Sequence, residues 1–338
     1  MSKQGPSLRI VIVSPALAAA NNGNWHTAHR WSRLLRDDYR VSIAAQWRGP
    51  EDGAADALIA LHARRSAASI DAFAQAHPGR ALLVVLTGTD LYRDIRSDAE
   101  ARRSLRQATR LVVLQAQGPQ ELPAALRDKC RVVFQSAAPL TPASKPASRL
   151  RVVMAGHLRP EKDPLCFMHA ALRLASRPEL RFEHIGDALE PSLAAAARDT
   201  ERANPHYRWL GGLPRAATRQ RIRRAHLLVN ASRMEGGAQV VIEAVQSGTA
   251  VLASRIGGHV GLLGADYAGF FEPGDANALA RLIARAHDEP TWLELLLEQG
   301  RRRAPLFDPG AERASLLHLL HDALADTSAP SSLAKETR

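Results

Sequence analysis

Residues 226–248, HLLVNASRMEGGAQVVIEAVQSG, combine a strand, a glycine turn and a helix in one short segment. The apolar run from His226 to Ser232 predicts a buried parallel strand that opens into a loop. Gly236 and Gly237 lack a Cβ atom, so a ligand can approach the backbone where the next helix offers unpaired N–H groups. Such a helix end attracts anions. The segment therefore predicts an anion-binding turn in an α/β fold.

The apolar positions from Ala238 to Ser247 predict a packed helix, and Gly248 suits the position just past its end. Glu243 interrupts this apolar stretch, and a buried carboxylate needs a partner or a ligand. The spacing equally permits a second interpretation, in which Glu243 lies on the solvated side of the helix and Glu235 only favours its positive end. The segment alone leaves both open.

The chain has 338 residues, more than one hydrophobic core usually serves, so we expect two domains. Its 46% hydrophobic and 23% charged residues are typical of a globular protein, and no apolar run reaches the roughly 18 residues that cross a bilayer. The two cysteines, Cys130 and Cys166, are too far apart in sequence for a CxxC pair and too few for a disulfide framework. We expect a soluble, cytoplasmic protein without stable membrane association.

The formal net charge of +11 predicts an anionic partner, which would be a phosphorylated small molecule, a nucleic acid or an anionic lipid. The arginines are scattered over predicted helices without a recognition motif or a basic tail. Aromatic residues make up only 5% of the chain, which is poor for stacking bases. Nucleic acid is therefore not the expected partner.

Strand and helix patterns alternate along both halves of the chain, which predicts parallel sheets with ligands at the carboxyl ends of their strands. The predicted strands are 8–14, 40–45, 57–61, 82–86, 111–115 and 132–134, then 152–155, 181–185, 207–210, 226–230 and 250–253. Predicted helices include 25–36, 65–76, 99–108, 238–247, 275–287, 292–302 and 310–324. The expected organisation is a domain over 1–136, a linker over 137–149, a domain over 150–305, a last helix over 306–326 and a frayed tail over 327–338.

The loop after the first strand of the second half, residues 156–164, reads GHLRPEKDP. Arg159 and Lys162 are two cations just beyond a strand, where a guanidinium fork and a point charge would hold a diphosphate. A basic pair alone is weak evidence. Together with Gly236 and Gly237 on another loop at the same sheet edge, it predicts one phosphate-binding crevice.

Glu235 and Glu243 form a Glu-x7-Glu motif, and with the glycines and the basic pair the second half resembles the donor domain of GT-B glycosyltransferases of the GT4 type over roughly residues 150–290. The resemblance implies that Glu243 holds the ribose hydroxyls of a nucleotide-sugar and that Glu235 meets the donor sugar. It implies that Arg159 and Lys162 neutralise the diphosphate, so that the catalytic group is Glu235, Arg159 and Lys162. The implied donor-binding set is Arg159, Lys162, Leu213, Glu235, Gly236, Gly237, Ala238 and Glu243.

Four further stretches, PALAAANNGNWHTAHRWSRLL (15–35), ALIALHARRSA (57–67), VVLTGTDLYRDI (84–95) and VVFQSA (132–137), extend a closer likeness over almost the whole chain. They are similar to the selenosugar synthases of selenoneine biosynthesis, GT-B enzymes that join selenophosphate to the anomeric carbon of a UDP-sugar. The resemblance implies UDP-GlcNAc or UDP-glucose and selenophosphate as substrates. The first half departs from the usual GT4 acceptor pattern: Thr87–Asp90 stands where a His-containing segment is common, and Gln135-Ser136 where Asn-Gly is.

Three loops of the first half supply the predicted acceptor site, and each has a plainer interpretation. The first loop, Asn21–Asn24, equally suits a turn with Asn24 as the helix N-cap. The second loop, His62–Arg65, follows a strand and would bind a phosphoryl group, or simply begin a solvated helix. The third loop, Thr87–Asp90, offers hydroxyl groups to a ligand, while Asp90 would cap a turn. The predicted acceptor-binding residues are Asn22, Gly23, Asn24, His62, Arg64, Thr87, Gly88 and Thr89.

No Asp-x-Asp sequence occurs, which disfavours a transferase that holds the diphosphate through a metal and agrees with stabilisation by cations and a helix end. No metal and no cofactor beyond the UDP-sugar co-substrate are expected. The expected fold is α/β: two doubly wound, Rossmann-like domains of the GT-B type facing a central cleft, with the donor on the second and the acceptor on the first.

The expected activity is formation of a carbon–selenium bond between selenophosphate and a UDP-sugar. The alternative is a GT4-type transferase that moves a sugar to a carbohydrate or lipid-linked acceptor. A basic nucleic-acid-binding protein without catalysis is the competing class. Release of UDP separates this last class from both enzymes.

Overall fold

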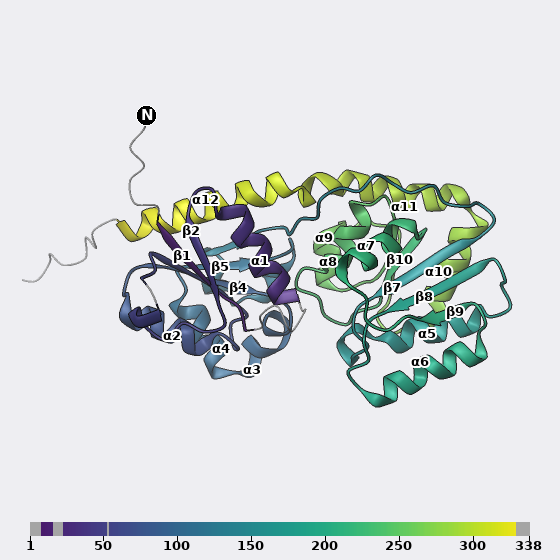
Figure 1. Cartoon of the computed structure of the whole chain (residues 1–338), viewed down its shortest axis with the longest axis horizontal. Helices are drawn as coiled ribbons and strands as arrows, with labels where there is room; N and C mark the ends of the chain where they lie inside the picture. The colour runs from purple at the N-terminus through teal and green to yellow at the C-terminus, as the bar shows by residue number, and fades with distance from the viewer. Residues whose placement is uncertain (1–7, 16–22, 53, 329–338) are drawn as a thin grey trace, which may run out of the picture. The chain divides into compact units, whose positions relative to one another are not determined.

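The computed structural model describes residues 8–15, 23–52 and 54–328, and the chain divides into two compact units (Figure 1). The first unit contains the described residues up to Gln135 and those from Pro309 onward. The second contains Ser136–Asp308. The chain therefore leaves the first unit once and returns to it with its last helix.

The first unit is built around a parallel sheet with the strand order β2-β1-β3-β4-β5-β6. Its strands are β1 (Arg9–Val13), β2 (Arg40–Ala44), β3 (Ala57–Leu61), β4 (Ala81–Leu86), β5 (Arg110–Val113) and β6 (Cys130–Val132). Its α-helices are α1 (Gly23–Leu35), α2 (Ala67–Ala76), α3 (Ile95–Ser97), α4 (Ala99–Gln107) and α12 (Pro309–Ser328). The strand order reverses between β1 and β3, and ligands of doubly wound folds bind at such a switch point.

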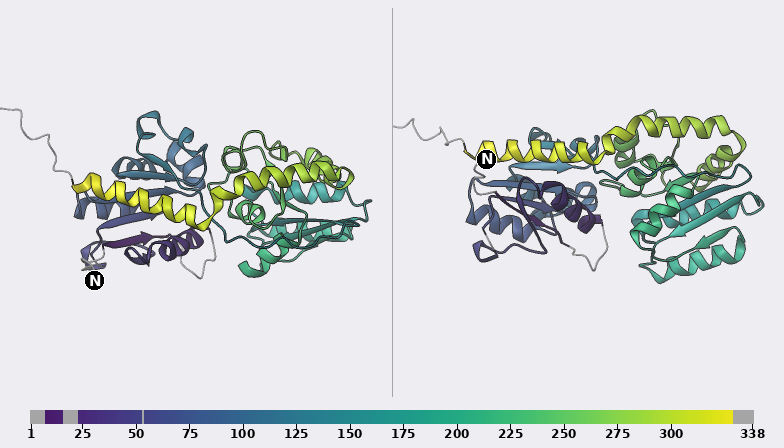
Figure 2. Two further views of the ribbon diagram at one scale, coloured as in Figure 1. Left: turned by 90° about the horizontal axis from the view of Figure 1, so that it is seen from above. Right: turned by 45° about the horizontal axis from the view of Figure 1, so that its top comes forward.

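Both faces of the first sheet are buried along its central strands β1, β3, β4 and β5, because successive side chains of a strand point to opposite sides and are almost all apolar here. Val11 packs in one cluster with Phe73 of α2, whereas Ile10 packs in the other with Trp31 of α1. Leu316, Leu319, Leu320 and Ala323 of α12 join this second cluster. Figure 2 shows α12, in yellow, lying along the first unit. The returning helix is thus part of the first unit's core.

An ion pair and a hydrogen bond reinforce the attachment of α12 to the first unit. Glu312 is buried, accepts a hydrogen bond from the indole of Trp31 at 2.7 Å and pairs with Arg30 Nε at 2.9 Å. A buried carboxylate with a charged and a neutral donor is compensated. The partners of this helix come from the start of the chain, so its sequence pattern alone does not identify them.

The second unit has the parallel strand order β12-β11-β10-β7-β8-β9. Its strands are β7 (Leu150–Ala155), β8 (Leu180–Ile185), β9 (Tyr207–Trp209), β10 (Leu227–Asn230), β11 (Ala250–Ser254) and β12 (Phe270–Phe271). Its α-helices are α5 (Pro164–Arg173), α6 (Pro191–Ala203), α7 (Arg215–Arg224), α8 (Gln239–Val245), α9 (Gly257–Leu263), α10 (Ala276–Asp288) and α11 (Pro290–Arg303). The switch point lies between β7 and β10.

The α/β prediction is confirmed: each unit is a doubly wound, Rossmann-like parallel sheet. Two local predictions about helix ends are wrong. Asn24 is not an N-cap, because α1 begins at Gly23 and places Asn24 in its first turn. The helix expected over 238–247 spans only Gln239–Val245, and the chain then turns at Gly248 with a φ of 66°. No helix within the described part of the chain is long and apolar enough to cross a membrane.

Candidate functional site

The switch point of the second unit places two loops side by side, because β7 and β10 are hydrogen-bonded neighbours. The loop after β7 carries Arg159 and Lys162, and the loop after β10 carries Glu235. The first loop is fixed by a close approach of two backbones: a Cβ atom at Gly186 would lie 2.0 Å from the carbonyl oxygen of Gly156. Only glycine fits at 186, where φ is 142°.

Side-chain and backbone contacts join these two loops. Lys162 Nζ lies 2.5 Å from Glu235 Oε1. Arg233 pairs with Asp163 at 2.9 Å and donates its backbone N–H to the carbonyl of Glu161. The Glu235 and Lys162 positions that the sequence placed at one sheet edge are therefore in direct contact in the fold.

Glu235 is buried and uses a single oxygen for its partners. Besides Lys162, Oε1 accepts hydrogen bonds from Ser232 Oγ at 2.7 Å and from Asn230 Nδ2 at 3.3 Å. Burial opposes ionisation, but the Lys162 ammonium and the hydrogen bonds outweigh it and lower the pKa of Glu235 to about 2. Among the described residues, no hydrogen bond reaches Oε2. This oxygen is left able to accept a further hydrogen bond.

The loop after β11 completes this edge with a residue that the sequence reasoning missed. A Cβ atom at Gly258 would lie 2.2 Å from the carbonyl oxygen of Glu235, so glycine lets α9 pack directly on the Glu235 backbone. Next to it, His259 is fully buried and donates from Nδ1 to the carbonyl of Ser254 at 2.8 Å. Burial lowers the pKa of His259, which favours the neutral ring. In the sequence, the Gly257-Gly258-His259 run shortly after the predicted strand 250–253 could have indicated that this loop belongs to the site.

Glu243 lies on α8 with an exposed fraction of only 3%, so its assignment to the solvated side of the helix is wrong. Its partner is Arg215 at the start of α7, whose Nε and Nη2 donate to Oε1 at 3.1 and 2.9 Å. Arg219 Nε lies 4.0 Å away. No hydrogen bond reaches Oε2 within the described residues, so Glu243 repeats the pattern of Glu235. The sequence predicted a partner but did not identify Arg215.

The remaining predicted donor residues lie in three loops of the second unit, which follow β7, precede α7 and precede α8. Gly236, Gly237 and Ala238 are buried in the loop that connects Glu235 to α8. Leu213 is half-buried, two residues before Arg215. Arg159 is exposed and has no ion-pair partner among the residues that the structure describes. At this edge, Arg159 is therefore an exposed cation without an ion-pair partner among the described residues, whereas the cations Lys162 and Arg233 pair with Glu235 and Asp163.

At the switch point of the first unit, the loop after β3 begins with a strained residue. His62 takes the left-handed conformation with a φ of 73°, which is uncommon for a residue with a side chain. Its Nε2 lies 3.1 Å from Thr89 Oγ1, and its Nδ1 accepts from the backbone N–H of Arg65 at 3.3 Å. Burial lowers the pKa of His62 below its ordinary value, against the attraction of Asp90. The ring is therefore neutral at neutral pH.

Two carboxylates that were not predicted as site residues organise these loops. Asp90 Oδ1 accepts the backbone N–H groups of Thr87 and Gly88, each at 2.9 Å, and Oδ2 accepts that of Ala63 at 2.9 Å. The expectation that Asp90 caps a turn is confirmed, and the residue also ties the loop after β4 to the loop after β3. Asp90 begins a π-helical turn, Asp90–Asp94, and such turns are frequent at functional sites.

Asp94 holds Arg64, the predicted acceptor cation. Arg64 Nε donates to Oδ2 at 2.9 Å, and Arg93 Nε donates to Oδ1 at 3.2 Å. Burial would raise the pKa of Asp94, but these hydrogen bonds lower it below its ordinary value. Arg64 is 39% exposed, and its terminal nitrogens have no partner in the described part of the chain. It remains able to bind an anion.

The structure brings together five of the eight predicted acceptor residues: His62, Arg64, Thr87, Gly88 and Thr89. Gly23 and Asn24 lie in the first turn of α1. Asn22 lies outside the described residues. Gln135 donates to Thr27 of α1 at 2.6 Å, which connects the end of the first unit to that helix.

Residues 142–303 match the family model described as Glycosyl transferases group 1. The matched segment lies within the second unit and contains Arg159, Lys162, Glu235 and Glu243. No curated protein matches the chain. The family match assigns the second unit to the group 1 glycosyltransferases.

Solved structures resemble both units together. A sucrose-phosphate synthase from Thermosynechococcus elongatus has a TM-score of 0.75 at 17% identity, over 94% of this chain and 99% of that one. Anabaena HepE in complex with UDP and glucose has a TM-score of 0.70 at 16% identity, over 93% of this chain and 100% of that one. A pneumococcal O-GlcNAc transferase in complex with UDP and GlcNAc scores 0.63 at 17% identity, over 79% and 57%. These likenesses show the GT-B fold.

Proposed function

We propose that this group 1 glycosyltransferase transfers a sugar from a UDP-sugar to selenophosphate, forming a carbon–selenium bond at the anomeric carbon. The observation that carries the donor half of the proposal is the Lys162–Glu235 pair at the switch point of the second unit. HepE and the pneumococcal transferase, which share the fold, were both crystallised with UDP. The acceptor half rests on the sequence resemblance and on the loops of the first unit.

On the donor side, the two glutamates have matching roles. Each gives one oxygen to a cation and leaves Oε2 without a hydrogen bond among the described residues. In this proposal Oε2 of Glu243 accepts from a ribose hydroxyl and Oε2 of Glu235 accepts from the donor sugar. Their cation partners fix the two carboxylates in place before the ligand arrives, which lowers the entropic cost of binding.

The chemical step needs a group that takes up negative charge on the diphosphate. Selenium attacks the anomeric carbon, the bond from that carbon to the diphosphate oxygen breaks, and the electron pair leaves with UDP. Arg159 and Lys162 would stabilise this charge, with Lys162 shared between Glu235 and the diphosphate. Water later cleaves the selenium–phosphorus bond and releases phosphate. We propose that no metal takes part, so turnover should survive EDTA.

On the acceptor side, the loops of the first unit would hold the phosphoryl oxygens. Arg64 offers its terminal nitrogens because only Nε is bound to Asp94. Thr87, Thr89 and neutral His62 add hydroxyl and ring contacts, and Asp90 fixes the loop that carries them. Selenium is a strong nucleophile, so positioning suffices and little general-base help is needed.

One observation favours the alternative, a GT4-type transferase that acts on a carbohydrate or lipid-linked acceptor. Asp94 already takes up the charge of Arg64 and Arg93, so this site is less cationic than its sequence suggested. Carboxylates suit the hydroxyl groups of a sugar acceptor. The choice between the two acceptors is therefore a question for a product assay.

The test is an anaerobic mixture of purified protein, selenophosphate and either UDP-GlcNAc or UDP-glucose, followed by mass spectrometry. We expect a selenosugar together with UDP and phosphate. The selenium proposal is wrong if UDP is released and a carbohydrate acceptor is glycosylated while no selenosugar forms. Both enzyme proposals are wrong if no UDP is released, either with selenophosphate or with a carbohydrate acceptor.

A further inference from the structure

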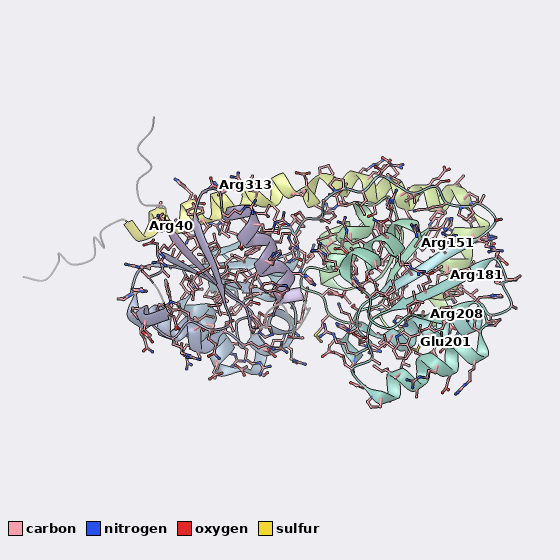
Figure 3. The ribbon with its side chains drawn as sticks, viewed as in Figure 1. Arg40, Arg151, Arg181, Glu201, Arg208 and Arg313 are labelled. Atoms are coloured by element: carbon pink, nitrogen blue, oxygen red, sulfur yellow. The ribbon has the colours of Figure 1, made fainter. Side chains whose placement is uncertain are left out.

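A second basic site lies beside the C-terminal part of α7, on strands β7, β8 and β9 of the second sheet. Arg151, Arg181 and Arg208 come from the neighbouring strands β7, β8 and β9 (Figure 3). They alternate with apolar residues, and the buried Val152, Phe182 and Tyr207 flank them along the strands. Because side chains alternate across a strand, the register places the three arginines on one face of the sheet.

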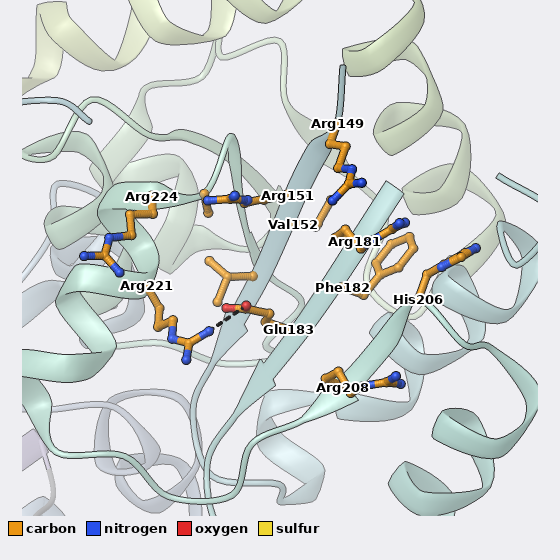
Figure 4. A pocket seen from close by; sticks show the side chains of 12 residues that line it. Arg149, Arg151, Val152, Arg181, Phe182, Glu183, His206, Arg208, Arg221 and Arg224 are labelled. Carbon is orange, nitrogen blue, oxygen red and sulfur yellow. Dashed lines mark hydrogen bonds and ion pairs between the residues drawn. The ribbon is translucent and has the colours of Figure 1, made fainter. Parts of the chain in front are cut away.

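Three more arginines complete a hollow of about 330 Å³. We call it the basic hollow and define it by Arg149, Arg151, Arg181, Arg208, Arg221 and Arg224. Arg221 and Arg224 come from α7, so the hollow has a strand floor and a helix wall (Figure 4). Glu183 is the one carboxylate that lines it, and it pairs with Arg221 at 2.8 Å.

The other five guanidinium groups have no carboxylate partner in the described part of the chain. Arg181 and Arg208 donate only to nearby backbone carbonyls. Arg151 and Arg181 are directly opposite in the register of β7 and β8, and like charges so placed repel. By contrast, exposed Arg301 and Arg302 on α11 both pair with Glu298. The basic hollow therefore lacks the counter-charge that this chain supplies elsewhere.

The basic hollow is separate from the candidate donor edge, by which we mean the loops after β7 and β10 that carry Arg159, Lys162 and Glu235. Arg149 precedes β7 and Arg151 and Arg181 lie near the starts of their strands, whereas Arg159 and Lys162 follow the end of β7. None of its six arginines contacts Glu235 or Glu243. A ligand here would therefore occupy a second site on the same unit.

We propose that the basic hollow binds a small soluble anion with two or more phosphoryl groups. Guanidinium forks bind phosphate oxygens in pairs, and several forks at one place favour a ligand with several such groups. The volume is within the range of small-molecule sites. A concave site with arginines on both floor and wall surrounds a small anion, whereas a flat bilayer or a nucleic-acid duplex would contact its rim.

The binding test is calorimetric titration of tripolyphosphate into the full-length protein in the presence of excess UDP, which would occupy the donor edge. The test variant is Arg151→Gln/Arg181→Gln, and the matched control is Arg301→Gln/Arg302→Gln, which removes the same charge. We expect the test variant to bind about tenfold to a hundredfold more weakly, as the loss of charged contacts predicts. The control should bind like the wild type.

Equal affinity in the wild type and the test variant would overturn the proposal, as would absence of tripolyphosphate binding. So would binding that occurs only with phosphatidylglycerol vesicles or with RNA, because each identifies a different partner. Excess UDP serves only to mask the donor edge. The comparison between the wild type and the test variant measures tripolyphosphate binding alone, so it remains valid even if the proposed transferase activity is not found.

A second measurement separates binding from a structural role. Without ligand and at low salt, the test variant should melt at the same temperature as the wild type or higher, because it relieves the repulsion between Arg151 and Arg181. Tripolyphosphate should raise the melting temperature of the wild type more than that of the variant. A lower melting temperature of the unliganded variant would assign the two arginines to the fold and contradict the proposal.

Discussion

The switch-point sites of the two units share a topology and differ in how they use carboxylates. In the second unit, Glu235 and Glu243 pair with the side-chain cations Lys162 and Arg215. In the first unit, Asp90 accepts three backbone N–H groups, which fixes its loops to one another. A side-chain cation can be shared with an incoming anion, whereas a backbone N–H that holds a loop cannot leave without unfolding it.

The position of a site at a parallel sheet follows from the topology, while the chemistry of the site follows from its loops. At the edge of the second sheet where we propose that the donor binds, the cations pair with side chains and can be shared with a ligand that gains negative charge during the reaction. The edge of the first sheet where we propose that the acceptor binds is a turn held by three backbone hydrogen bonds to Asp90, with the strained His62 beside it. Substituting single residues at both edges should distinguish cations that bind a ligand from cations that only stabilise the fold.

Replacing Lys162 should have the largest effect. Lys162→Ala removes a cation that we place on the leaving diphosphate, so turnover should fall about 10²- to 10³-fold, the size of effect seen when one such group is lost. The measurement is the rate of UDP release at saturating substrates. Lys129→Ala in the first unit, where the ammonium donates to the carbonyls of Arg106 and Ala108, is the control. Equal losses in both variants would mean that Lys162 has no special role.

Replacing Glu235 should alter stability in acid. The pKa of Glu235 is lowered from 4.5 to about 2, so the folded protein gains stability from its ionisation above the unfolded value and loses that gain as pH falls from about 4.5 to 2. The shift corresponds to about 3 kcal/mol. Glu235→Gln should therefore be less stable than the wild type at pH 7, and the gap should narrow towards pH 2. Urea unfolding across this range measures it, and a constant gap would contradict the assigned ion pair.

Replacing Glu243 should weaken donor binding by about 1.5 to 3 kcal/mol, the value of a charged hydrogen bond. Calorimetric titration of UDP into folded Glu243→Ala measures this. Glu179→Ala is a matched control, because Glu179 also pairs with an arginine, Arg177, in the same unit. Unchanged UDP affinity for both Glu243→Ala and Lys162→Ala would remove the donor assignment.

Replacing Arg64 should have the smallest effect, because Asp94 already shares its charge. Arg64→Ala should raise the KM for selenophosphate about tenfold, near the lower limit for one charged contact, and leave UDP affinity unchanged. Arg93→Ala is the matched control, since Arg93 contacts the same carboxylate at 3.2 Å. If the two variants behave alike, the effect comes from Asp94 and not from contact with the acceptor.

The sequence predicted the parallel strands, because buried strands are continuous apolar runs that local patterning reveals. It also placed Arg159, Lys162 and Glu235 at one edge, since carboxyl ends of parallel strands meet at the same side of a sheet. The short β12 and α9 were missed: two residues, Phe270 and Phe271, carry too little pattern to indicate a strand. Helix α8 proved shorter than its apolar pattern because the turn at Gly248 determines where the chain leaves it.

The two α/β halves, the Glu-x7-Glu spacing and the excess of positive charge can be read from the amino-acid sequence, because each depends on residue type and order alone. The pairing of the charged residues, in contrast, becomes visible in the folded structure. Arg215 was identified as the partner of Glu243, Asp94 as the partner of Arg64 and Glu312 as the partner of Arg30, over separations of 28, 30 and 282 residues. Such pairs depend on how strands and helices pack in three dimensions, and no local pattern records that.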